Sequence, residues 1–511
     1  MQPPLPPLQV IALNRAGFGP RPGDLERVAQ VGFVNYIERQ LDPLSIPDAE
    51  AEQRIADGGF TTLDKSLDQL WQDHVVDANG DPALEILPYQ ETAAATLIRQ
   101  IYSERQLFEV IVEFWHNHFN VPGVGASAVY VHYDRDVIRQ HALGNFRELL
   151  EAVAQSTAML IYLDNFTNSD AGPNENFARE LFELHTLGIE NYYGLIPQDQ
   201  VPVDGNGDPL GYVDEDVYEG TRCFTGWTIA WDPDDPNQPE PGTFYYHDEW
   251  HDRFQKHVLG MTLPSDQPPL KDGRDVFDAL ASMPGTGRHI ARKLCRRLIS
   301  DDPPDSLVDQ AADVFTTEWQ APDQIASVVR TIVLSPEFRS TWGEKVKRPV
   351  EIAVSALRAG QVDFGFRLDN PDTVAFGIAL TQAGQGYFQH PRPDGYPDTM
   401  AAWLSTSPRA MSWRFVNSFA AAFDADTGIH YMDLVGQTPP DVRSSNAIVE
   451  FWVDRIFGRP IRPADRTEVV EFMAQGVNPD FDLPLDEDPE IQDRLRSMVG
   501  LLFMLPDFLW R

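Results

Sequence analysis

Residues 174–188 read NENFARELFELHTLG, a stretch whose apolar side chains recur at the spacing of an α-helix. One face of this predicted helix is polar and carries Glu180 and Glu183, whereas the other is apolar except for His185 in its middle. The same periodicity recurs at 24–41, 92–119, 129–155, 273–300, 306–317, 322–335, 346–359, 372–383, 408–423, 445–457, 463–474 and 488–504. The sequence therefore predicts a mainly α protein, a large multi-helical single domain that spans residues 1–511.

One segment predicts strands instead. The stretches WTIAW and TFYYH flank DPDDPNQPEPG, residues 232–242, which is rich in proline and aspartate. Short β-branched and aromatic runs on either side of a turn-forming segment are typical of a β-hairpin. We therefore expect a minor β-hairpin over 227–247 with a long acidic tip.

The charge balance excludes some partners. The 511 residues include 78 acidic and 40 basic side chains, which give a net charge of -38. Nucleic acid is an unsuitable partner for such a chain, because binding it requires a basic surface.

No stretch reaches the roughly 18 uninterrupted apolar residues of a membrane span. Two cysteines, Cys223 and Cys295, leave room for one disulfide at most.

The first twenty residues do not fix the compartment. They lack the basic and apolar regions of a signal peptide. We expect a periplasmic or secreted protein if a signal has been removed, and a cytoplasmic one otherwise.

A possible calcium loop lies at VDGNGDP, residues 203–209. Asp204, Asn206, Asp208 and Glu215 occupy positions one, three, five and twelve of an EF-hand-like loop. Pro209 stands where such a loop needs glycine, and Asn-Gly-Asp is also common in ordinary turns. The segment predicts either a turn or a calcium site.

A second helix repeats the arrangement of residues 174–188. In LFEVIVEFWHNHFN, residues 107–120, the polar stripe contains Glu109, Glu113, His116, Asn117 and Asn120. His118 lies on the apolar side. Burying an imidazole without a partner costs roughly 1–3 kcal/mol, so His118 and His185 should each bond to something. We expect the two helices to pack together and share a partner.

Three arrangements are compatible with these residues. In the first, His118 and His185 are hydrogen-bonded core residues that fix helix packing. In the second, they bind Zn or Fe together with Glu180 or Glu183. In the third, Glu113 and His116 face Glu180 and Glu183 in a two-metal site of the helical-bundle type.

Many segments resemble one bacterial family, the domain of unknown function numbered eighteen hundred, over roughly residues 8–505. They are LNRAGFGPRPGDLERVAQVG, EFWHNHFNV, HALGNFRELL, AMLIYLDN, NENFARELFELHTLG, DVYEGTRCFTGW, HDRFQKHVLG, IARKLCRRLISDDPP, VKRPVEIAVSALRA, GQGYF and LLFMLPDFLW. The resemblance implies a helical, often exported protein, frequently encoded beside a sulfatase-like partner, and it supplies no reaction. Residues 195–215 look like an acidic insertion loop. The residues that match the family best are Asn117, His118, Asn176, Arg179, Glu180, Glu183 and His185.

The leading hypothesis is a metal-dependent enzyme of the cell envelope or secreted fraction that uses a His/Glu pocket. Its candidate catalytic residues are Glu180, Glu183, His185, Asn117 and His118. The alternative is a non-catalytic envelope or assembly protein in which the same residues form a buried structural network.

Overall fold

Helices dominate the computed structural model, which describes residues 4–205, 207–232, 238–421 and 430–511. Helical residues make up 59% of the chain, so the predicted mainly α fold is confirmed. The first half contains α1 (Leu8–Arg15), α2 (Asp24–Val31), α3 (Phe33–Gln40), α4 (Ala49–Asp57), α5 (Leu67–Trp71), α6 (Pro82–Tyr102), α7 (Gln106–His118), α8 (Tyr130–His132), α9 (Phe146–Gln155), α10 (Thr157–Tyr162), α11 (Asn176–Glu180) and α12 (Asp214–Cys223).

The second half continues in the same manner. It contains α13 (Lys271–Ser282), α14 (Pro284–Leu298), α15 (Asp305–Thr317), α16 (Gln324–Val333), α17 (Pro336–Ser340), α18 (Pro349–Ala359), α19 (Pro371–Gln382), α20 (Met400–Trp403), α21 (Thr406–Ala421), α22 (Leu434–Gln437), α23 (Ser445–Phe457), α24 (Pro463–Ala474), α25 (Pro489–Met504) and α26 (Pro506–Leu509).

Shorter helical turns join these elements. Three are π-helical, namely η2 (Gln72–Val76), η4 (Tyr133–Arg139) and η6 (Leu181–His185). The others are 3₁₀ turns: η1 (Pro43–Ser45), η3 (Ser127–Val129), η5 (Asn165–Thr167), η7 (Ile189–Asn191), η8 (Gln198–Gln200) and η9 (Asp248–Trp250).

Several predicted helices are divided in two. The range 24–41 becomes α2 and α3 because Gly32 between them adopts a φ of 85°, which a helix does not contain. The range 273–300 becomes α13 and α14 because Pro284 begins a new helix at its first position, where its missing N–H is not needed. Periodicity identified these segments as helical, and the residues that break them set their ends.

Within the described residues, the strands form three small antiparallel pairs. The predicted hairpin is present: β1 (Trp227–Ile229) pairs with β2 (Phe244–Tyr246), and residues 233–237 of its tip lie outside the described residues. Two further pairs were not predicted, namely β3 (Lys256–Val258) with β4 (Met261–Leu263), and β5 (Asp363–Phe364) with β6 (His430–Tyr431).

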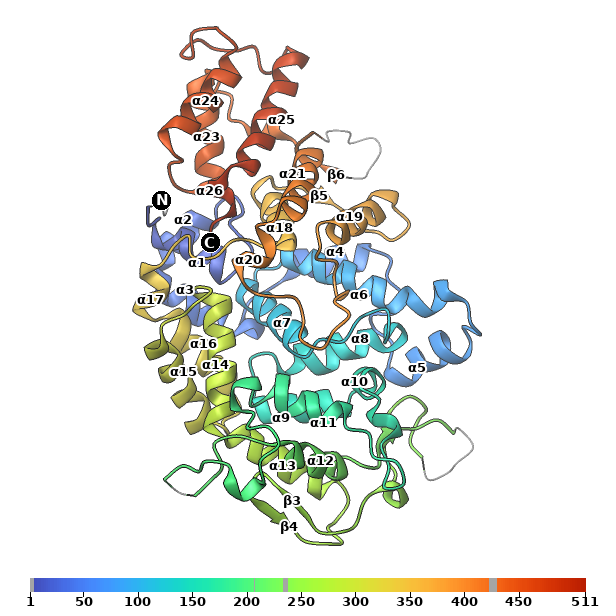
Figure 1. Cartoon of the computed structure of the whole chain (residues 1–511). Coiled ribbons are helices and arrows are strands. Elements are labelled where there is room, and N and C mark those ends of the chain that lie inside the picture. The colour runs from blue at the N-terminus through green and yellow to red at the C-terminus, as the bar shows by residue number, and fades with distance from the viewer. Residues whose placement is uncertain (1–3, 206, 233–237, 422–429) are drawn as a thin grey trace.

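One cluster of buried apolar side chains extends through the molecule, from Val10 to Leu509. In Figure 1, α23, α24 and α25 lie at one end, α12, α13 and the β3–β4 hairpin lie at the other, and α6 and α7 run through the middle. The last residues of the chain return to this middle part, where the Arg511 amide donates to the Lys345 carbonyl. The predicted single domain stays a prediction.

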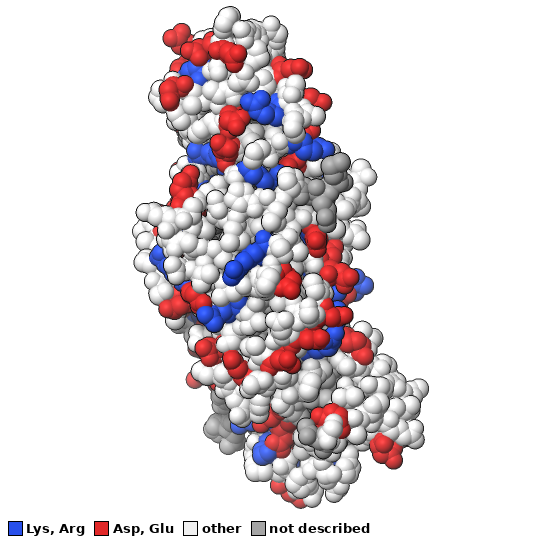
Figure 2. Space-filling model, turned by 90° about the vertical axis from the view of Figure 1, so that its left-hand side faces the viewer, with Lys and Arg blue, Asp and Glu red and all other residues white. Residues whose placement is uncertain are grey.

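The cysteines, the helix lengths and the surface charges can be compared with what the composition predicted. Both Cys223 and Cys295 are buried free thiols, so the disulfide that the sequence allowed is not formed. Among the described helices, none is both long and apolar enough to cross a bilayer. Figure 2 shows acidic and basic side chains interspersed over one face of the molecule.

Candidate functional site

The two histidine-bearing helices meet. His118, the last residue of α7, donates from Nε2 to the backbone carbonyl of His185 at 3.1 Å, and the two ring centroids are 6.1 Å apart. Each residue is 1% exposed. The predicted packing of these helices against each other is therefore confirmed, and the partner that His118 finds is a backbone carbonyl.

The helix that carries His185 ends in an unusual turn. The predicted helix of residues 174–188 consists of α11 followed by the π-helical η6, whose last residue is His185. The Thr186 hydroxyl donates to the Leu181 carbonyl at 2.6 Å and so satisfies one carbonyl of this turn. π-Helical turns are rare and occur frequently at functional sites, so this turn marks a candidate site.

Three ring nitrogens in this junction have no hydrogen-bond partner among the described residues. They are Nδ1 and Nε2 of His185 and Nδ1 of His118. Burial, together with the charges of Lys293 and His289, lowers the pKa of His185 to about 3. Burial likewise holds the pKa of His118 well below its ordinary value. Both imidazoles are therefore neutral at pH 7 and keep lone pairs that could bind a ligand.

Two asparagines of the α7 segment hold residues 390–398, which we call the clamp loop. The Asn117 amide donates to the Tyr396 carbonyl at 2.7 Å and accepts from the Tyr396 N–H at 2.6 Å. Asn120 donates to two more carbonyls of the loop, those of His390 at 2.9 Å and Arg392 at 2.7 Å. Asn117, a predicted catalytic residue, is thus placed where it fixes this loop.

A cavity of about 170 Å³, which we call the Lys293 cavity, lies between α7, α14 and the clamp loop. A wider surface cavity of about 710 Å³ adjoins it and shares Lys293 and Arg296. The Lys293 cavity is lined by Glu113, Phe114, Asn117, His118, Lys293, Arg296, Arg297, Arg348, Asp394, Tyr396, Pro397 and Asp398.

The acidic side chains of this cavity are all paired with bases. The pairs are Glu113 with Arg348 at 2.7 Å, Asp394 with His390 at 3.0 Å and Asp398 with Lys345 at 3.2 Å. Arg297 is also engaged, because it contacts Glu113 at 3.2 Å.

Two bases of the cavity have no carboxylate partner within the described part of the chain, Lys293 and Arg296. Arg296 donates from Nε to the Asp301 backbone carbonyl at 3.0 Å, which leaves its charge uncompensated. Burial lowers the pKa of Lys293 to about 8. The cavity therefore has positive charge to spare in a protein whose net charge is -38.

Glu180 and Glu183 do not line this cavity. Glu180 is half-buried, and its burial, followed by the charge of Glu183, raises its pKa to about 7. Asp394 of the clamp loop contributes to the same shift. Burial, assisted by the charges of Glu180 and Asp394, also raises the pKa of Tyr162 to about 12. Glu180, Glu183 and Asp394 therefore act on one another electrostatically, and Asp394 also lines the Lys293 cavity.

Asn176 and Arg179, which also match the family, make polar contacts on the surface of α11. Asn176 donates to the Asp164 carboxylate at 3.3 Å. Arg179 pairs with Glu175 at 3.1 Å and with Asp214 at 3.4 Å. Their contacts are all with neighbouring polar side chains of this part of the molecule.

Glu113 and His116 do not face Glu180 and Glu183 as the predicted two-metal site requires, because each binds another partner. Glu113 pairs with Arg348, and the His116 Nε2 donates to Asp134 at 2.8 Å. Asp134 in turn pairs with Arg139 at 2.9 Å. Within the described residues, no three or more His, Cys, Asp or Glu side chains are grouped so as to hold a metal ion. The structure brings His118 and His185 together and does not add Glu180 or Glu183 to them.

The predicted calcium loop is partly described. Asn206 lies outside the described residues. Asp204 accepts from the Asp208 amide at 3.0 Å, and Asp204 donates from its own amide to the Asp208 carbonyl at 2.9 Å, as in a tight turn. Glu215 lies in the first turn of α12. Calcium binding stays a prediction.

Sequence analysis missed Lys293, Arg296 and the clamp loop. Lys293 and Arg296 are three residues apart on α14, within IARKLCRRLIS, so they lie on the same face of the helix. This basic stripe could have indicated an anion site. The clamp loop offers no local signal, because its contacts with Asn117 and Asn120 span about 270 to 280 residues of sequence.

Comparisons with known proteins give a family and no activity. The family model described as "Protein of unknown function (DUF1800)" matches residues 11–510, which confirms the resemblance that the sequence motifs indicated. No curated protein and no solved structure matches the chain.

Proposed function

We propose a function for this chain from the premise that it belongs to the DUF1800 family, whose description names no reaction. We infer an enzyme of the cell envelope or secreted fraction that acts on a small anionic substrate in the Lys293 cavity. The observation that carries this proposal is the pair of bases, Lys293 and Arg296, that share a cavity and have no carboxylate partner among the described residues. Export and a sulfatase-like partner stay predictions from the resemblance.

An anionic group would complete this cavity. Lys293 and Arg296 are half-buried without a carboxylate partner among the described residues, and the acids of the cavity are already paired with other bases, so an anion would gain from both charges. A guanidinium presents several donors in a planar fork, so Arg296 suits carboxylate, sulfate or phosphate groups. We therefore assign Arg296 to hold the anionic group of the substrate.

Lys293 is suited to move a proton. Its pKa of about 8 means that both the neutral amine and the ammonium are present near neutral pH. Glu180, with a pKa of about 7, is a carboxyl group that also titrates near neutral pH, and Asp394 acts electrostatically on both residues. Two titratable groups of opposite type, each shifted toward neutrality, support acid–base chemistry rather than binding alone.

The experiment compares p-nitrophenyl phosphate and p-nitrophenyl sulfate with the neutral p-nitrophenyl glucoside. Calorimetry measures binding, and absorbance follows p-nitrophenolate release. We expect at least one anionic compound to bind and react, the Arg296→Met variant to bind it at least tenfold more weakly, and Lys293→Met to bind it without turnover.

The matched control is Lys271→Met, which removes an exposed lysine at the start of α13 and should change neither quantity. Binding that survives Arg296→Met would remove the assigned anion site. Binding without turnover by any of the proteins would mean that this cavity belongs to a binding protein.

A metal-dependent form of the enzyme is a second candidate, favoured by the free ring nitrogens of His185 and His118. Neutral imidazole nitrogens are good ligands for Zn or Fe. Glu180 and Glu183 do not join them in this structure, so we derive no step through a metal. Elemental analysis of protein purified without chelators tests this form, which requires that His185→Ala abolishes metal content while the fold survives.

The non-catalytic alternative rests on a buried ion-pair network behind the cavity. Glu351 accepts from Arg297 at 2.7 Å and contacts Arg348 at 3.2 Å, and Arg348 also binds Glu113. Such a network can serve packing alone. In that case Glu113→Gln should lower the melting temperature while p-nitrophenyl phosphate, p-nitrophenyl sulfate and the glucoside all stay unbound and unreacted.

A further inference from the structure

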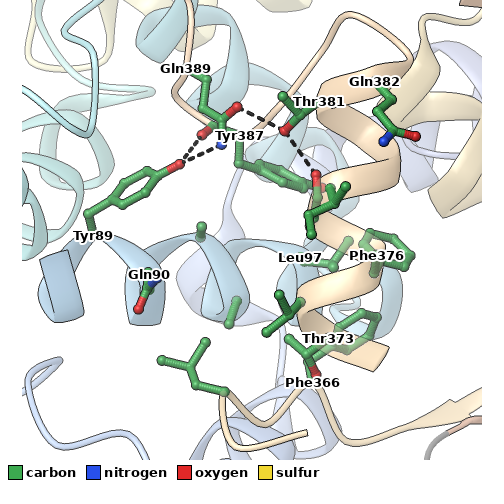
Figure 3. Close-up of a pocket in the computed structure, with 16 residues that line it drawn as sticks. Tyr89, Gln90, Leu97, Phe366, Thr373, Phe376, Thr381, Gln382, Tyr387 and Gln389 are labelled. Atoms are coloured by element: carbon green, nitrogen blue, oxygen red, sulfur yellow. Dashed lines mark hydrogen bonds between the residues drawn. The ribbon is translucent and has the colours of Figure 1, made fainter. Parts of the chain in front are cut away.

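A separate pocket, which we call the aromatic pocket, lies between α6, α19 and residues 387–389 (Figure 3). Its volume of about 390 Å³ falls in the range of roughly 300–1,000 Å³ that small-molecule sites occupy. It shares no lining residue with the Lys293 cavity. Its lining consists of Tyr89, Gln90, Ala93, Ala94, Leu97, Phe366, Leu368, Thr373, Val374, Phe376, Gly377, Ile378, Thr381, Gln382, Tyr387 and Gln389.

One end of the aromatic pocket is an apolar wall. Leu97, Phe366 and Phe376 lie together there in Figure 3, and the rings of Phe366 and Phe376 pack edge to face with centroids 5.4 Å apart. Phe366 adopts a φ of 39°, a left-handed conformation that is uncommon for a bulky residue, while its side chain stays fully buried. Such strained residues occur at ligand-binding sites when the surrounding packing holds them in place.

The opposite end of the pocket carries hydrogen-bonding groups. The Tyr89 hydroxyl donates to the Tyr387 carbonyl at 3.0 Å and accepts from the Gln389 amide at 3.0 Å. Thr381 lies 2.9 Å from the Gln389 Oε1 and also 2.9 Å from the Gly377 carbonyl. Because one hydroxyl proton can serve only one acceptor at a time, the amide oxygen of Gln389 can accept from a ligand.

The charge of the pocket selects the ligand. None of the described side chains that line it is ionisable at neutral pH, although 23% of the chain consists of charged residues. A charged ligand would leave its counter-ion behind on entry and meet no opposite charge. A ligand with an apolar body and one neutral polar group would satisfy both ends.

We infer that the aromatic pocket binds a small neutral amphiphile, with an aromatic or branched apolar body against Leu97, Phe366 and Phe376 and an uncharged hydrogen-bonding group at Gln389 and Tyr89. This site is independent of the anionic substrate proposed for the Lys293 cavity. Its occupant differs from that substrate in charge and in the surface that recognises it.

Calorimetric titration with three matched probes tests this inference: 4-butylbenzamide, 4-butylbenzoate and 4-butylbenzylammonium. The neutral amide should bind at least tenfold more tightly than either ion, because only the ions lose hydration without a partner. Ala93→Phe, which fills the pocket from α6, should abolish binding of the amide. The matched control is Ala83→Phe, an exposed position on the same helix outside the pocket, and it should bind as the unaltered protein does.

A second variant keeps the test decisive if Ala93→Phe fails to fold. Gln389→Leu should weaken binding of 4-butylbenzamide about fivefold and leave that of butylbenzene unchanged, since it removes one hydrogen bond. The inference is overturned if the benzoate binds as tightly as the amide, if Gln389→Leu changes neither probe, or if the amide does not bind at millimolar concentration. Each of these results leaves the proposal for Lys293 standing.

Discussion

At the scale of single residues, His185 is the most informative. Its folded pKa of about 3 lies below the ordinary value of 6.5, so the unfolded chain takes up a proton first as the pH falls. Its contribution to stability is therefore complete above pH 6.5 and is lost between pH 6.5 and 3, at up to about 1.4 kcal/mol per pH unit.

The corresponding prediction concerns acid unfolding of His185→Leu, measured with urea at several pH values. The free energy of unfolding should fall less steeply with acid in this variant than in the unaltered protein. His257→Leu, at an exposed position of β3, should retain the full dependence. Equal slopes in the unaltered protein and His185→Leu would mean that His185 titrates normally.

Glu180 should change the stability in the opposite direction as the pH varies. Its folded pKa of about 7 lies above the ordinary 4.5, so the folded protein holds the proton more tightly and loses stability as the pH rises from 4.5 to 7. Glu180→Gln removes this loss. Relative to the unaltered protein, its melting temperature should be higher at pH 8 than at pH 5, whereas the exposed Glu175→Gln should show no such trend. A difference that is independent of pH would contradict the raised pKa.

At the scale of elements, the contact between α7 and the clamp loop depends on a glycine. Gly395 adopts a φ of 70°, and a Cβ there would lie 2.0 Å from the Asn117 carbonyl oxygen. That oxygen belongs to the backbone, so it cannot turn aside without disturbing the two hydrogen bonds that Asn117 makes to Tyr396.

Gly395→Ala should therefore lower the free energy of unfolding by about 3 kcal/mol or more, measured by urea denaturation. The control is Gly476→Ala, where φ is 82° and no atom lies within 4 Å of the added Cβ. It should show only the left-handed backbone cost of about 1–2 kcal/mol. Similar losses in both variants would mean that the clamp loop adapts freely.

At the scale of the whole molecule, the net charge of -38 should govern the response to salt. Self-repulsion among surface carboxylates destabilises the compact state, and salt screens it over a Debye length that shortens to about 8 Å at 0.15 M. We expect the melting temperature to rise between about 0.02 M and 0.5 M NaCl, measured by calorimetry. A fall would show that exposed ion pairs contribute more than the repulsion does.

The helical class, the β1–β2 hairpin, and the burial and mutual contact of His118 and His185 could all be predicted before the structure was known. The class, the hairpin and the burial of each histidine follow from local periodicity. The contact between the two histidines, 67 residues apart, follows from the cost of burying an imidazole without a partner. The ends of the helices depended on single residues, such as Gly32 between α2 and α3, that the apolar periodicity does not take into account.

Which groups share the site depended on tertiary packing. A helical wheel placed Glu113 and Glu180 on polar faces, but distant segments supply charges that act on them: Arg348 binds Glu113, and Asp394 helps to raise the pKa of Glu180. Lys293 and the clamp loop join α7 from about 175 to 280 residues away, a separation over which no sequence spacing carries direction. Packing of these remote segments, and not local pattern, therefore set the charge of the cavity.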